Sequence, residues 1–278
     1  MREQASRPVL RRATLTILCG LVLTGAQLVH GETASSPDAK PTPVHVGTAA
    51  DYRPLVFKQD RKIAGIEADF VKLLSNDLDV PFEFVELAWT DLVPALRQGR
   101  IDLIMSGMSI TEERSELVAF TDPYLQTGQM ALIHRKDRTR LDDPAALRGG
   151  GIRVGVHEKT TGEKFARAEL TNATIVPYYG SIDDAIQALR ERKIDCVIHD
   201  APTIWRVVGR PGQEDPDLIG LYRPLTDEYL AWAVRKDDDD LRKRLNGALA
   251  KWRESGDLED VLDRWITIRR VSVEIAPK

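Results

Sequence analysis

The sequence predicts an α/β protein made of two Rossmann-like lobes. The stretch from Ala95 to Met105 (ALRQGRIDLIM) recurs 93 residues later from Ala188 to Ile198 (ALRERKIDCVI), so one structural unit occurs twice. Each copy has the pattern of an amphipathic helix, a charged turn and a short apolar strand, which is typical of a helix that returns to a parallel sheet. With 278 residues and 42% hydrophobic content, the chain can build two cores of ordinary domain size.

The first lobe is expected to begin at Val44, where a small, polar and proline-rich stretch ends. Apolar runs and helical periodicity alternate from this point. The resulting β-α-β-α-β order implies a parallel sheet with right-handed crossovers. The predicted elements are a strand at 44–47, a helix at 68–78, a strand at 82–86, a helix at 91–98 and a strand at 101–105.

The second lobe repeats this order, and Ser181 with Asp184 has capping-box spacing at the start of its second helix. Four aspartates, 237–240, lead the last helical region, where negative charge suits a helix N-terminus and need not indicate a metal site. We expect the chain to cross between the lobes near 124–126 and 226–230. The predicted elements are strands at 152–156, 174–176 and 195–198, helices at 161–170, 182–192 and 202–208, an extended segment at 229–234 and a helical region at 237–266.

Residues 1–31 have the pattern of a secretory signal peptide. Four arginines precede an uncharged, mostly apolar run from Ala13 to Val29, and small or modest residues follow where a signal peptidase would cut. A membrane anchor is the alternative, but this run of 17 residues is short for a span, which needs about 20 apolar residues. We therefore expect a cleaved signal, a disordered leader at 32–43 and a periplasmic location.

Composition excludes some classes of function. Cleavage after residue 31 removes four Arg and one Glu, a net charge of +3, so the formal charge changes from −4 to −7. An acidic chain without a basic stripe is not expected to bind nucleic acid. Cys196 would be the remaining cysteine, and its apolar strand favours a buried thiol. The motifs of zinc proteases, serine hydrolases and phosphate loops are absent from the sequence, and we expect no cofactor and no metal.

Polar residues follow the last predicted strand of each repeat. Arg114 lies just beyond Ser106-Gly-Met-Ser109, and Asp200 lies two residues beyond the strand at 195–198. Ligands of open α/β sheets bind outside the carboxyl ends of the strands. An arginine and an aspartate on two facing lobes would grip opposite ends of a zwitterion, because a guanidinium can give a carboxylate two parallel hydrogen bonds. The alternatives are a surface arginine and an aspartate that caps the following helix.

Three ordered motifs resemble a known family. Gly107-Met-Ser-Ile-Thr-Glu-Glu-Arg114, Phe120-Thr-Asp-Pro-Tyr124 and His199-Asp-Ala-Pro202 are similar to segments of the periplasmic solute-binding proteins of amino-acid ABC importers, bacterial extracellular solute-binding protein family 3. The resemblance covers about 44–266. It implies a type II periplasmic binding protein, with two lobes joined by a two-strand hinge, lobe 1 at 44–124 plus 230–268 and lobe 2 at 125–229. It also implies a monomer, with a membrane permease as its partner.

The resemblance further implies a set of ligand-binding residues. Arg114 matches the arginine that binds the ligand α-carboxylate, and Asp200 matches the aspartate that holds the α-ammonium. The other matches supply backbone groups, hydroxyl groups, aromatic walls and the amides of a helix start: Gly107, Ser109, Tyr52, Trp89, Thr160 and Thr161. Two positions depart from the family pattern, with Ala49 where many members have an acidic residue and Lys159 where the second-lobe turn usually has glycine.

Some of these residues have a purely structural alternative. Tyr52 and Trp89 could be core aromatics, and Thr160 with Glu163 has capping-box spacing. His157 and His199 each end a second-lobe strand, where either could contact a ligand side chain or bond to the backbone. We include His157 in the predicted ligand-binding set.

The predicted function is noncatalytic capture of an L-amino acid for import. Ala49, Lys159 and the two histidines favour a polar or acidic ligand side chain over a cationic one. The alternative is a carbon–oxygen lyase on the same scaffold, because Glu163-Lys-Phe-Ala-Arg167 is similar to a segment of periplasmic cyclohexadienyl or arogenate dehydratases. In that case a protonated carboxyl would act as the general acid. A sensor feeding a membrane receptor would have the same sequence features.

Overall fold

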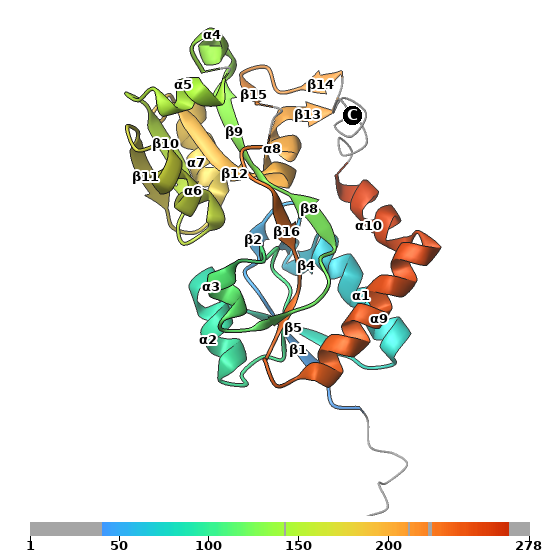
Figure 1. The fold of residues 1–278 in the computed structure, drawn as a ribbon. Coiled ribbons are helices and arrows are strands. Elements are labelled where there is room, and N and C mark those ends of the chain that lie inside the picture. The colour runs from blue at the N-terminus through green and yellow to red at the C-terminus, as the bar shows by residue number, and fades with distance from the viewer. Residues whose placement is uncertain (1–40, 142, 211, 222–223, 267–278) are drawn as a thin grey trace, which may run out of the picture. The chain divides into compact units, whose positions relative to one another are not determined.

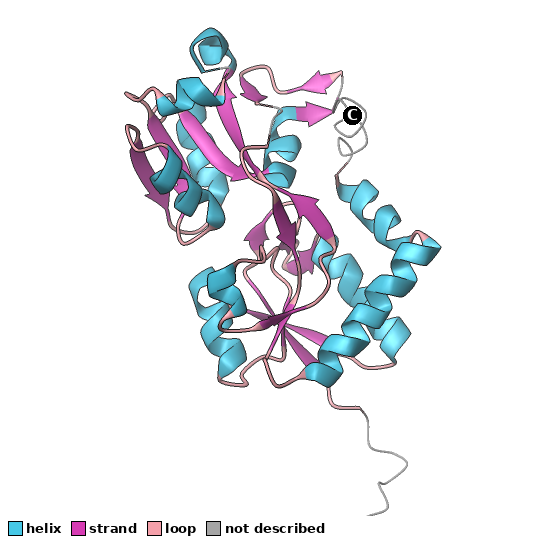
Figure 2. Cartoon of the chain, viewed as in Figure 1, coloured by secondary structure: helices cyan, strands magenta, loops and turns pink. Residues whose placement is uncertain are grey.

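The computed structural model describes residues 41–141, 143–210, 212–221 and 224–266. The predicted signal peptide at 1–31 and most of the predicted leader lie outside these residues. Within them, two five-stranded sheets are each accompanied by helices, as Figure 1 and Figure 2 show. None of the helices in the described ranges has the length and apolar character that a membrane span needs.

The first sheet has the order β5-β1-β6-β17-β7, in which β1 pairs in parallel with β5 and β6 while β17 runs antiparallel. Helix α1 packs against α9 and α10 (Figure 1), around a core that contains Phe70, Trp232 and Trp252. The strands are β1 (Val44–Thr48), β5 (Phe82–Glu86), β6 (Leu103–Ile104), β7 (Ala119–Phe120) and β17 (Ala233–Val234). The helices are α1 (Ile66–Leu78), η1 (Trp89–Asp91), α2 (Leu92–Arg97), α3 (Glu112–Ser115), α9 (Asp239–Ser255) and α10 (Asp257–Trp265).

The second sheet has the order β11-β10-β12-β9-β15, with β9 antiparallel to both of its neighbours. Cys196 is buried in β12, as predicted. The strands are β9 (Gln129–His134), β10 (Arg153–His157), β11 (Thr174–Tyr178), β12 (Cys196–Asp200) and β15 (Leu218–Gly220). The helices are η2 (Arg135–Asp137), α4 (Arg138–Leu141), α5 (Pro144–Arg148), α6 (Thr161–Glu169), α7 (Ile182–Arg190) and α8 (Ala201–Val208).

Smaller sheets complete the fold. Strands β8 (Leu125–Thr127) and β16 (Glu228–Leu230) pair antiparallel and carry the chain between the two large sheets; we call this pair the two-strand connection. The others are β2 (Asp51–Tyr52), β3 (Val56–Gln59) and β4 (Lys62–Ala64), and the pair β13 (Gly209–Arg210) and β14 (Gln213–Glu214). The α/β fold class is confirmed, whereas the exact lobe boundaries stay a prediction.

The structure corrects two predictions about these elements. Neither large sheet is purely parallel, because one strand in each runs antiparallel to its neighbours, β17 in the first sheet and β9 in the second. The helical region predicted at 237–266 is two helices. Gly256 separates them with a φ of 91°, a left-handed conformation that glycine adopts easily and that ends α9.

The sequence repeat has a structural counterpart at the start of β6 and of β12. The side chain of Asp102 accepts a hydrogen bond from the His45 amide at 3.0 Å, and Asp195 accepts one from the Arg153 amide at 2.9 Å. The Asp102 and Asp195 amides in turn donate to the carbonyls of those same partners. Each aspartate therefore fixes the register between the final strand of the repeat and its parallel neighbour.

Glycine fills an equivalent place in both sheets. A Cβ on Gly47 of β1 would lie 2.2 Å from Ile101 Cδ1, and a Cβ on Gly155 of β10 would lie 2.5 Å from Ile194 Cδ1. Ile101 and Ile194 occupy the same position of the repeat. The absent side chain lets the isoleucine pack against the strand, so the two lobes share their packing as well as their order of elements.

Candidate ligand-binding site

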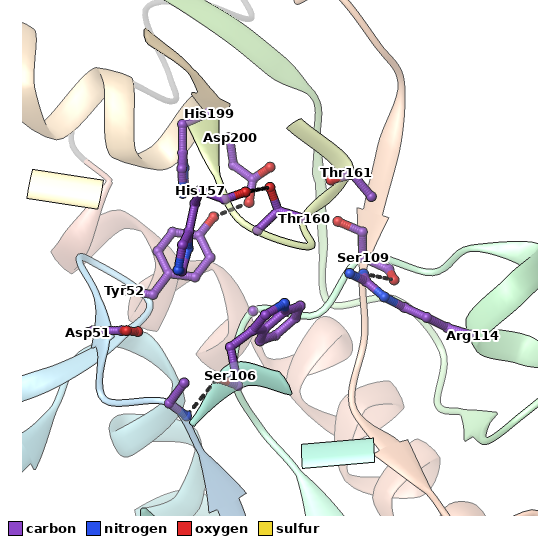
Figure 3. A pocket seen from close by; sticks show the side chains of 13 residues that line it. Asp51, Tyr52, Ser106, Ser109, Arg114, His157, Thr160, Thr161, His199 and Asp200 are labelled. Atoms are coloured by element: carbon purple, nitrogen blue, oxygen red, sulfur yellow. Dashed lines mark hydrogen bonds between the residues drawn. The ribbon is translucent and has the colours of Figure 1, made fainter. Parts of the chain in front are cut away.

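One pocket collects residues from elements that adjoin both large sheets. Its lining includes all nine residues predicted to bind ligand, and Figure 3 shows most of them. Four further residues line it that were not in the predicted set: Ala49, Asp51, Ser106 and His199. The structure therefore brings the predicted residues together, and their individual roles stay predictions.

Arg114 is placed by the short helix α3, and its backbone amide donates to the side chain of Thr111, which caps that helix. Its guanidinium donates to the Ser109 carbonyl at 2.8 Å and lies 5.1 Å from the centre of the Trp89 ring. Burial lowers the pKa of Arg114, while the charge of Asp200 opposes that shift. An arginine always stays protonated in proteins, so the pocket holds a fixed positive charge that is stacked on an aromatic face.

Asp200 ends β12 on the other side of the pocket. Its carboxylate accepts hydrogen bonds from the Tyr52 hydroxyl and the Gln129 side-chain amide. The alternative helix-capping role is wrong, because the Asp200 side chain makes no capping bond to α8. Burial raises the pKa of Asp200 to about 7, the nearby charge of Glu228 adds to this, and the hydrogen bonds and Arg114 oppose it.

A buried carboxylate supports the loop that follows β6. Glu67 of α1 accepts hydrogen bonds from the Gly107 amide at 2.9 Å, the Tyr124 hydroxyl at 2.7 Å and the Trp232 indole at 2.9 Å. Burial raises the pKa of Glu67 to about 7, although all three bonds favour the ionised form. Gly107 has a φ of 63°, and a Cβ there would lie 2.7 Å from the Tyr52 ring, so glycine is required.

The same loop is hydrogen-bonded to the two-strand connection. The Ile110 amide donates to the Tyr229 carbonyl at 2.8 Å, and the Ala231 amide donates to the Met108 carbonyl at 3.1 Å. Ser109, which lines the pocket, pairs with Leu230 in an isolated bridge. The pocket wall and the segment that joins the sheets thus form one continuous backbone network.

The turn before α6 brings Thr160 and Thr161 to the pocket. Thr160 caps the helix by accepting from the Glu163 amide at 3.3 Å, as predicted. Glu163 reaches back to the Lys159 amide at 2.7 Å and pairs with Arg167 at 2.8 Å. Its carboxyl is thus engaged at the surface of the helix. Glu163 is absent from this pocket but lines an adjoining one together with Arg114, Thr160 and Thr161, so it is the bonds occupying its carboxyl that argue against a general acid at this position.

Lys159 stands in the turn before α6, where the family pattern usually has glycine. Its φ is 55°, in the left-handed region that favours glycine. Two hydrogen bonds hold it there, one from its amide to Glu163 and one from the Trp89 indole to its carbonyl at 3.1 Å. Trp89 belongs to the first lobe, so its ring both lines the pocket and bonds across to the turn.

The pocket extends away from Arg114 to a carboxylate and two imidazoles. The rings of His157 and His199 lie 6.4 Å apart and nearly parallel, and His199 meets the Tyr52 ring edge-on at 5.1 Å. Burial lowers the pKa of His199 to about 3, so this ring is neutral at ordinary pH. Burial raises the pKa of Asp51 and the nearby His157 opposes that shift. Figure 3 shows Asp51 on the side of the pocket away from Arg114.

Sequence reasoning missed three residues of this region for identifiable reasons. Asp51 stands two positions after Ala49, outside the three motifs that carry the family resemblance. Gln129 and Glu228 contact Asp200 or its partner from β9 and β16, neither of which ends in a recognisable motif. An acidic residue beside a predicted strand end was the available signal for Asp51. For Gln129 and Glu228 no local signal existed.

Two α/β lobes with a two-strand connection, and a pocket that takes residues from both, define a two-lobed small-molecule-binding protein. The chain belongs to the bacterial extracellular solute-binding proteins, family 3, whose family model matches residues 44–268. The L-arginine-binding protein of Pseudomonas aeruginosa is 31% identical over 240 residues, which cover 81% of this chain and 88% of that protein. A probable histidine-binding protein of Campylobacter jejuni is 30% identical over 213 residues, covering 76% and 79%.

Solved structures agree with the family. The ancestral amino acid-binding protein AncCDT-1, described as a precursor of cyclohexadienyl dehydratase, aligns with a TM-score of 0.74 and 30% identity over 81% of this chain and 95% of that one. A putative ABC transporter binding component from Wolinella succinogenes, complexed with lysine, aligns with a TM-score of 0.71 and 28% identity over the same shares. These relatives are named as binding proteins.

Proposed function

We propose that the chain binds an L-α-amino acid in the periplasm, as a monomer, and presents it to the permease of an ABC importer. The observation that carries the proposal is the placement of Arg114 and Asp200 on one pocket, from elements that adjoin different sheets (Figure 3). A guanidinium and a carboxylate so placed complement the α-carboxylate and α-ammonium of one zwitterion. Such a ligand favours closure of the lobes because it contacts both of them.

For the ligand side chain we propose a basic group. Asp51 lines the pocket away from Arg114 and receives no cationic side chain among the ion pairs of the described residues. The named relatives are binding proteins for arginine or histidine, and one solved structure contains lysine. These names do not support the polar or acidic ligand side chain expected from Ala49 and the histidines. We therefore propose arginine, lysine and histidine as the first candidate ligands.

A thermal-shift screen of the twenty amino acids tests the proposal directly. A ligand at 100 times its dissociation constant stabilises the folded protein by about 2.7 kcal/mol, which gives a clear rise in Tm. We expect the largest rise from arginine, lysine or histidine. A rise with none of the twenty amino acids would contradict amino-acid binding.

Calorimetry with analogues assigns the two ends of the ligand. Arg114→Ala should weaken the binding free energy of L-arginine by about 2–5 kcal/mol. It should barely affect the binding of agmatine, which lacks the carboxylate. Asp200→Asn should weaken the binding of L-arginine far more than the binding of its deaminated analogue, 5-guanidinopentanoate. Arg97→Ala, an exposed arginine of α2, is the matched control and should bind as the wild type does. If a variant lost equal affinity for L-arginine and for the analogue, the substituted residue would not have the role assigned to it.

We propose a noncatalytic role in preference to the dehydratase alternative. The engagement of Glu163 by Lys159 and Arg167 supports this, as do the relatives' names as binding proteins. Purified protein mixed with prephenate or arogenate should yield no phenylpyruvate or phenylalanine. Turnover above the buffer rate, lost in Glu163→Gln, would reverse the preference.

A further inference from the structure

Behind Asp200, three elements bring polar groups to one buried place. Gln129 opens β9, Asp200 ends β12 and Glu228 begins β16. The Gln129 side-chain nitrogen is hydrogen-bonded to Asp200 Oδ1 and lies 3.1 Å from Glu228 Oε1. Two carboxylates are therefore held close together by one amide group. Asp200 lines the pocket, and Glu228 lies behind it on the two-strand connection.

This cluster contains more hydrogen-bond acceptors than donors. Thr226 donates to Glu228 Oε1 at 2.8 Å, and Tyr52 donates to Asp200. Glu228 Oε2 and Gln129 Oε1 are shielded from solvent and receive no hydrogen bond from any group in the described part of the chain. Buried acceptors without donors are costly, and two neighbouring carboxylates repel each other. The repulsion therefore favours a proton or an ammonium group on one of the two carboxylates, and Asp200 is the more deeply buried of the pair.

The groups around Asp200 act in opposite directions on its protonation. Burial and the charge of Glu228 raise its pKa, whereas the bonds from Tyr52 and Gln129 and the charge of Arg114 lower it. His199, its neighbour on β12, is buried and neutral and adds no charge. Among these groups Glu228 is the charge that favours a proton on Asp200.

We propose that Glu228 keeps a proton on Asp200 in the ligand-free protein and that the ammonium group of the ligand displaces this proton on binding. The inference rests on the proposed function and adds a positioning residue to it. In the exchange the O–H bond of Asp200 breaks, the proton leaves to solvent, and the carboxylate accepts hydrogen bonds from the ammonium group. Tyr52 can stay in place throughout, because its hydroxyl donates to the ionised carboxylate and can donate to or accept from the protonated carboxyl.

Affinity should then depend on pH in a way that Glu228 controls. Below the pKa of Asp200, each pH unit lowers the fraction of ionised carboxylate, and so the affinity, about tenfold. Binding at pH 6 should be about tenfold weaker than at pH 8 in the wild type. Glu228→Gln removes the repelling charge, so it should shift this profile to lower pH and flatten the difference between pH 8 and pH 6.

The first experiment needs no ligand. Carboxyl carbons are followed by NMR during a pH titration of the ligand-free wild type, Glu228→Gln and Glu228→Asp. Asp227→Asn, an exposed neighbour on the same connection that bonds to Gln126, is the control. Asp200 should titrate near 7 in the wild type and in the control, about one unit or more lower in Glu228→Gln, and near the wild-type value in Glu228→Asp. An Asp200 that titrates in the ordinary range, or that ignores Glu228→Gln, overturns the inference.

The second experiment counts protons. Calorimetry with L-arginine, or with the amino acid that gives the largest thermal shift, is run at pH 6 in two buffers of different ionisation enthalpy. The wild type should release close to one proton per ligand, and Glu228→Gln clearly fewer. Amino-acid binding without proton release would end this inference and leave the proposed function standing. If no amino acid binds, the proposed function fails, and so does the displacement step that rests on it.

Discussion

Glu67 shows how one buried residue can fix a binding loop. Its two carboxylate oxygens accept from a loop amide, a tyrosine hydroxyl and an indole, and its side chain is fully shielded from solvent. Tyr124 precedes the two-strand connection and Gly107 lines the pocket. A single carboxylate therefore holds the pocket wall, the core and the start of the connection in one arrangement.

Glu67→Gln should destabilise the protein because its amide nitrogen would face the Trp232 indole or the other two donors. The expected loss is about 2–4 kcal/mol in the free energy of unfolding, measured by urea denaturation. Trp232→Phe removes one of these donors. The double variant should therefore lose less stability than the sum of the losses in the two single variants. Simple additivity would mean that the indole bond is not the cause.

At the level of elements, the repeat explains most of what could be predicted from the sequence. Helix and strand periodicity located β1, β5 and α6 within a residue or two, because these elements alternate apolar and polar faces. The antiparallel β9 was not predicted, because it is buried along its whole length without an alternating pattern and, unlike the equally buried β12, it lies outside the repeat. The split between α9 and α10 depends on Gly256, and an isolated glycine in a helical pattern can be tolerated inside the helix as well as end it.

The candidate site was predictable to a similar extent. Arg114, Asp200 and the threonine turn follow strand ends in the order that the fold requires, so sequence order gave their position in space. Gln129 and Glu228 reach the region through tertiary contacts between distant segments. No spacing along the chain encodes such contacts.

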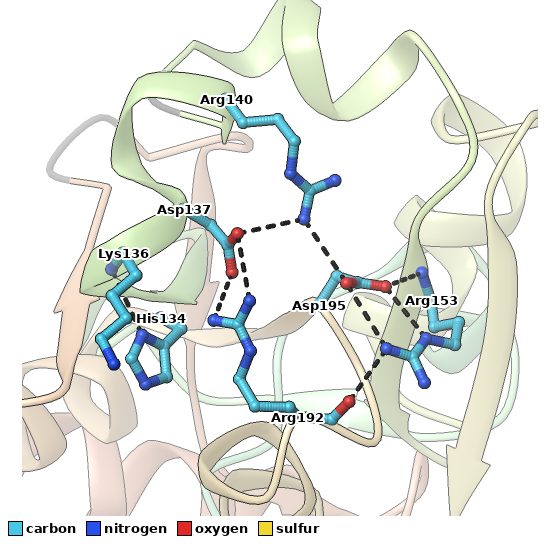
Figure 4. A network of polar contacts seen from close by, with 7 residues as sticks. All are labelled: His134, Lys136, Asp137, Arg140, Arg153, Arg192 and Asp195. Atoms are coloured by element: carbon cyan, nitrogen blue, oxygen red, sulfur yellow. Dashed lines mark hydrogen bonds and ion pairs between the residues drawn. The ribbon is translucent and has the colours of Figure 1, made fainter.

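Asp195 anchors a network of charges at the start of β12, which Figure 4 shows. It pairs with Arg153 at 3.0 Å and Arg140 at 3.4 Å, and Asp137 pairs with Arg192 at 2.8 Å and with Arg140 at 3.4 Å. Burial alone would raise the pKa of Asp195, but its bonds to Arg153 and the charge of Arg140 hold that pKa below its usual value. The network joins η2 and α4 to the second sheet.

Asp195→Asn should therefore cost stability only where the wild-type carboxyl is ionised. Because its folded pKa lies below its unfolded value, its contribution is present above about pH 4 and is lost as pH falls through the folded pKa. We expect a loss of about 1–2 kcal/mol at pH 7 by urea unfolding, shrinking as the pH is lowered toward 3. Asp102→Asn, the repeat equivalent, should cost a similar amount at pH 7. A loss that stays constant with pH would point to packing instead of charge.

For the molecule as a whole, the contacts between the lobes near the pocket differ in kind. Thr203 donates to the Arg53 carbonyl at 3.2 Å, and the indole of Trp89 donates to the Lys159 carbonyl, both through neutral groups. Lys164 and Glu113 form an exposed ion pair at 2.7 Å. All three contacts lie beside ligand-binding residues, but the ion pair, which we call the rim pair, is exposed and therefore screened by solvent.

Reversing the rim pair tests whether the lobes meet in this way when ligand binds. Glu113→Lys places like charges opposite each other and should weaken ligand affinity a few-fold, less at high salt. Adding Lys164→Glu restores opposite charges and should restore most of the affinity, measured by calorimetry at low ionic strength. If the double variant is as weak as the single one, Glu113 acts through its neighbour Arg114 and not through the ion pair.

The backbone hydrogen bond between Ile110 and Tyr229 makes position 229 a suitable site for attaching a dye. The side chain of Tyr229 is 41% exposed, while its carbonyl is fixed to the loop that carries Ser109. Among the described residues the only cysteine, Cys196, is buried. A dye coupled to a cysteine introduced at 229 would lie where the loop that follows β6 meets the two-strand connection. Movement of either segment would change the surroundings of the dye and so its fluorescence. A fluorescent amino-acid sensor could therefore be built on this position.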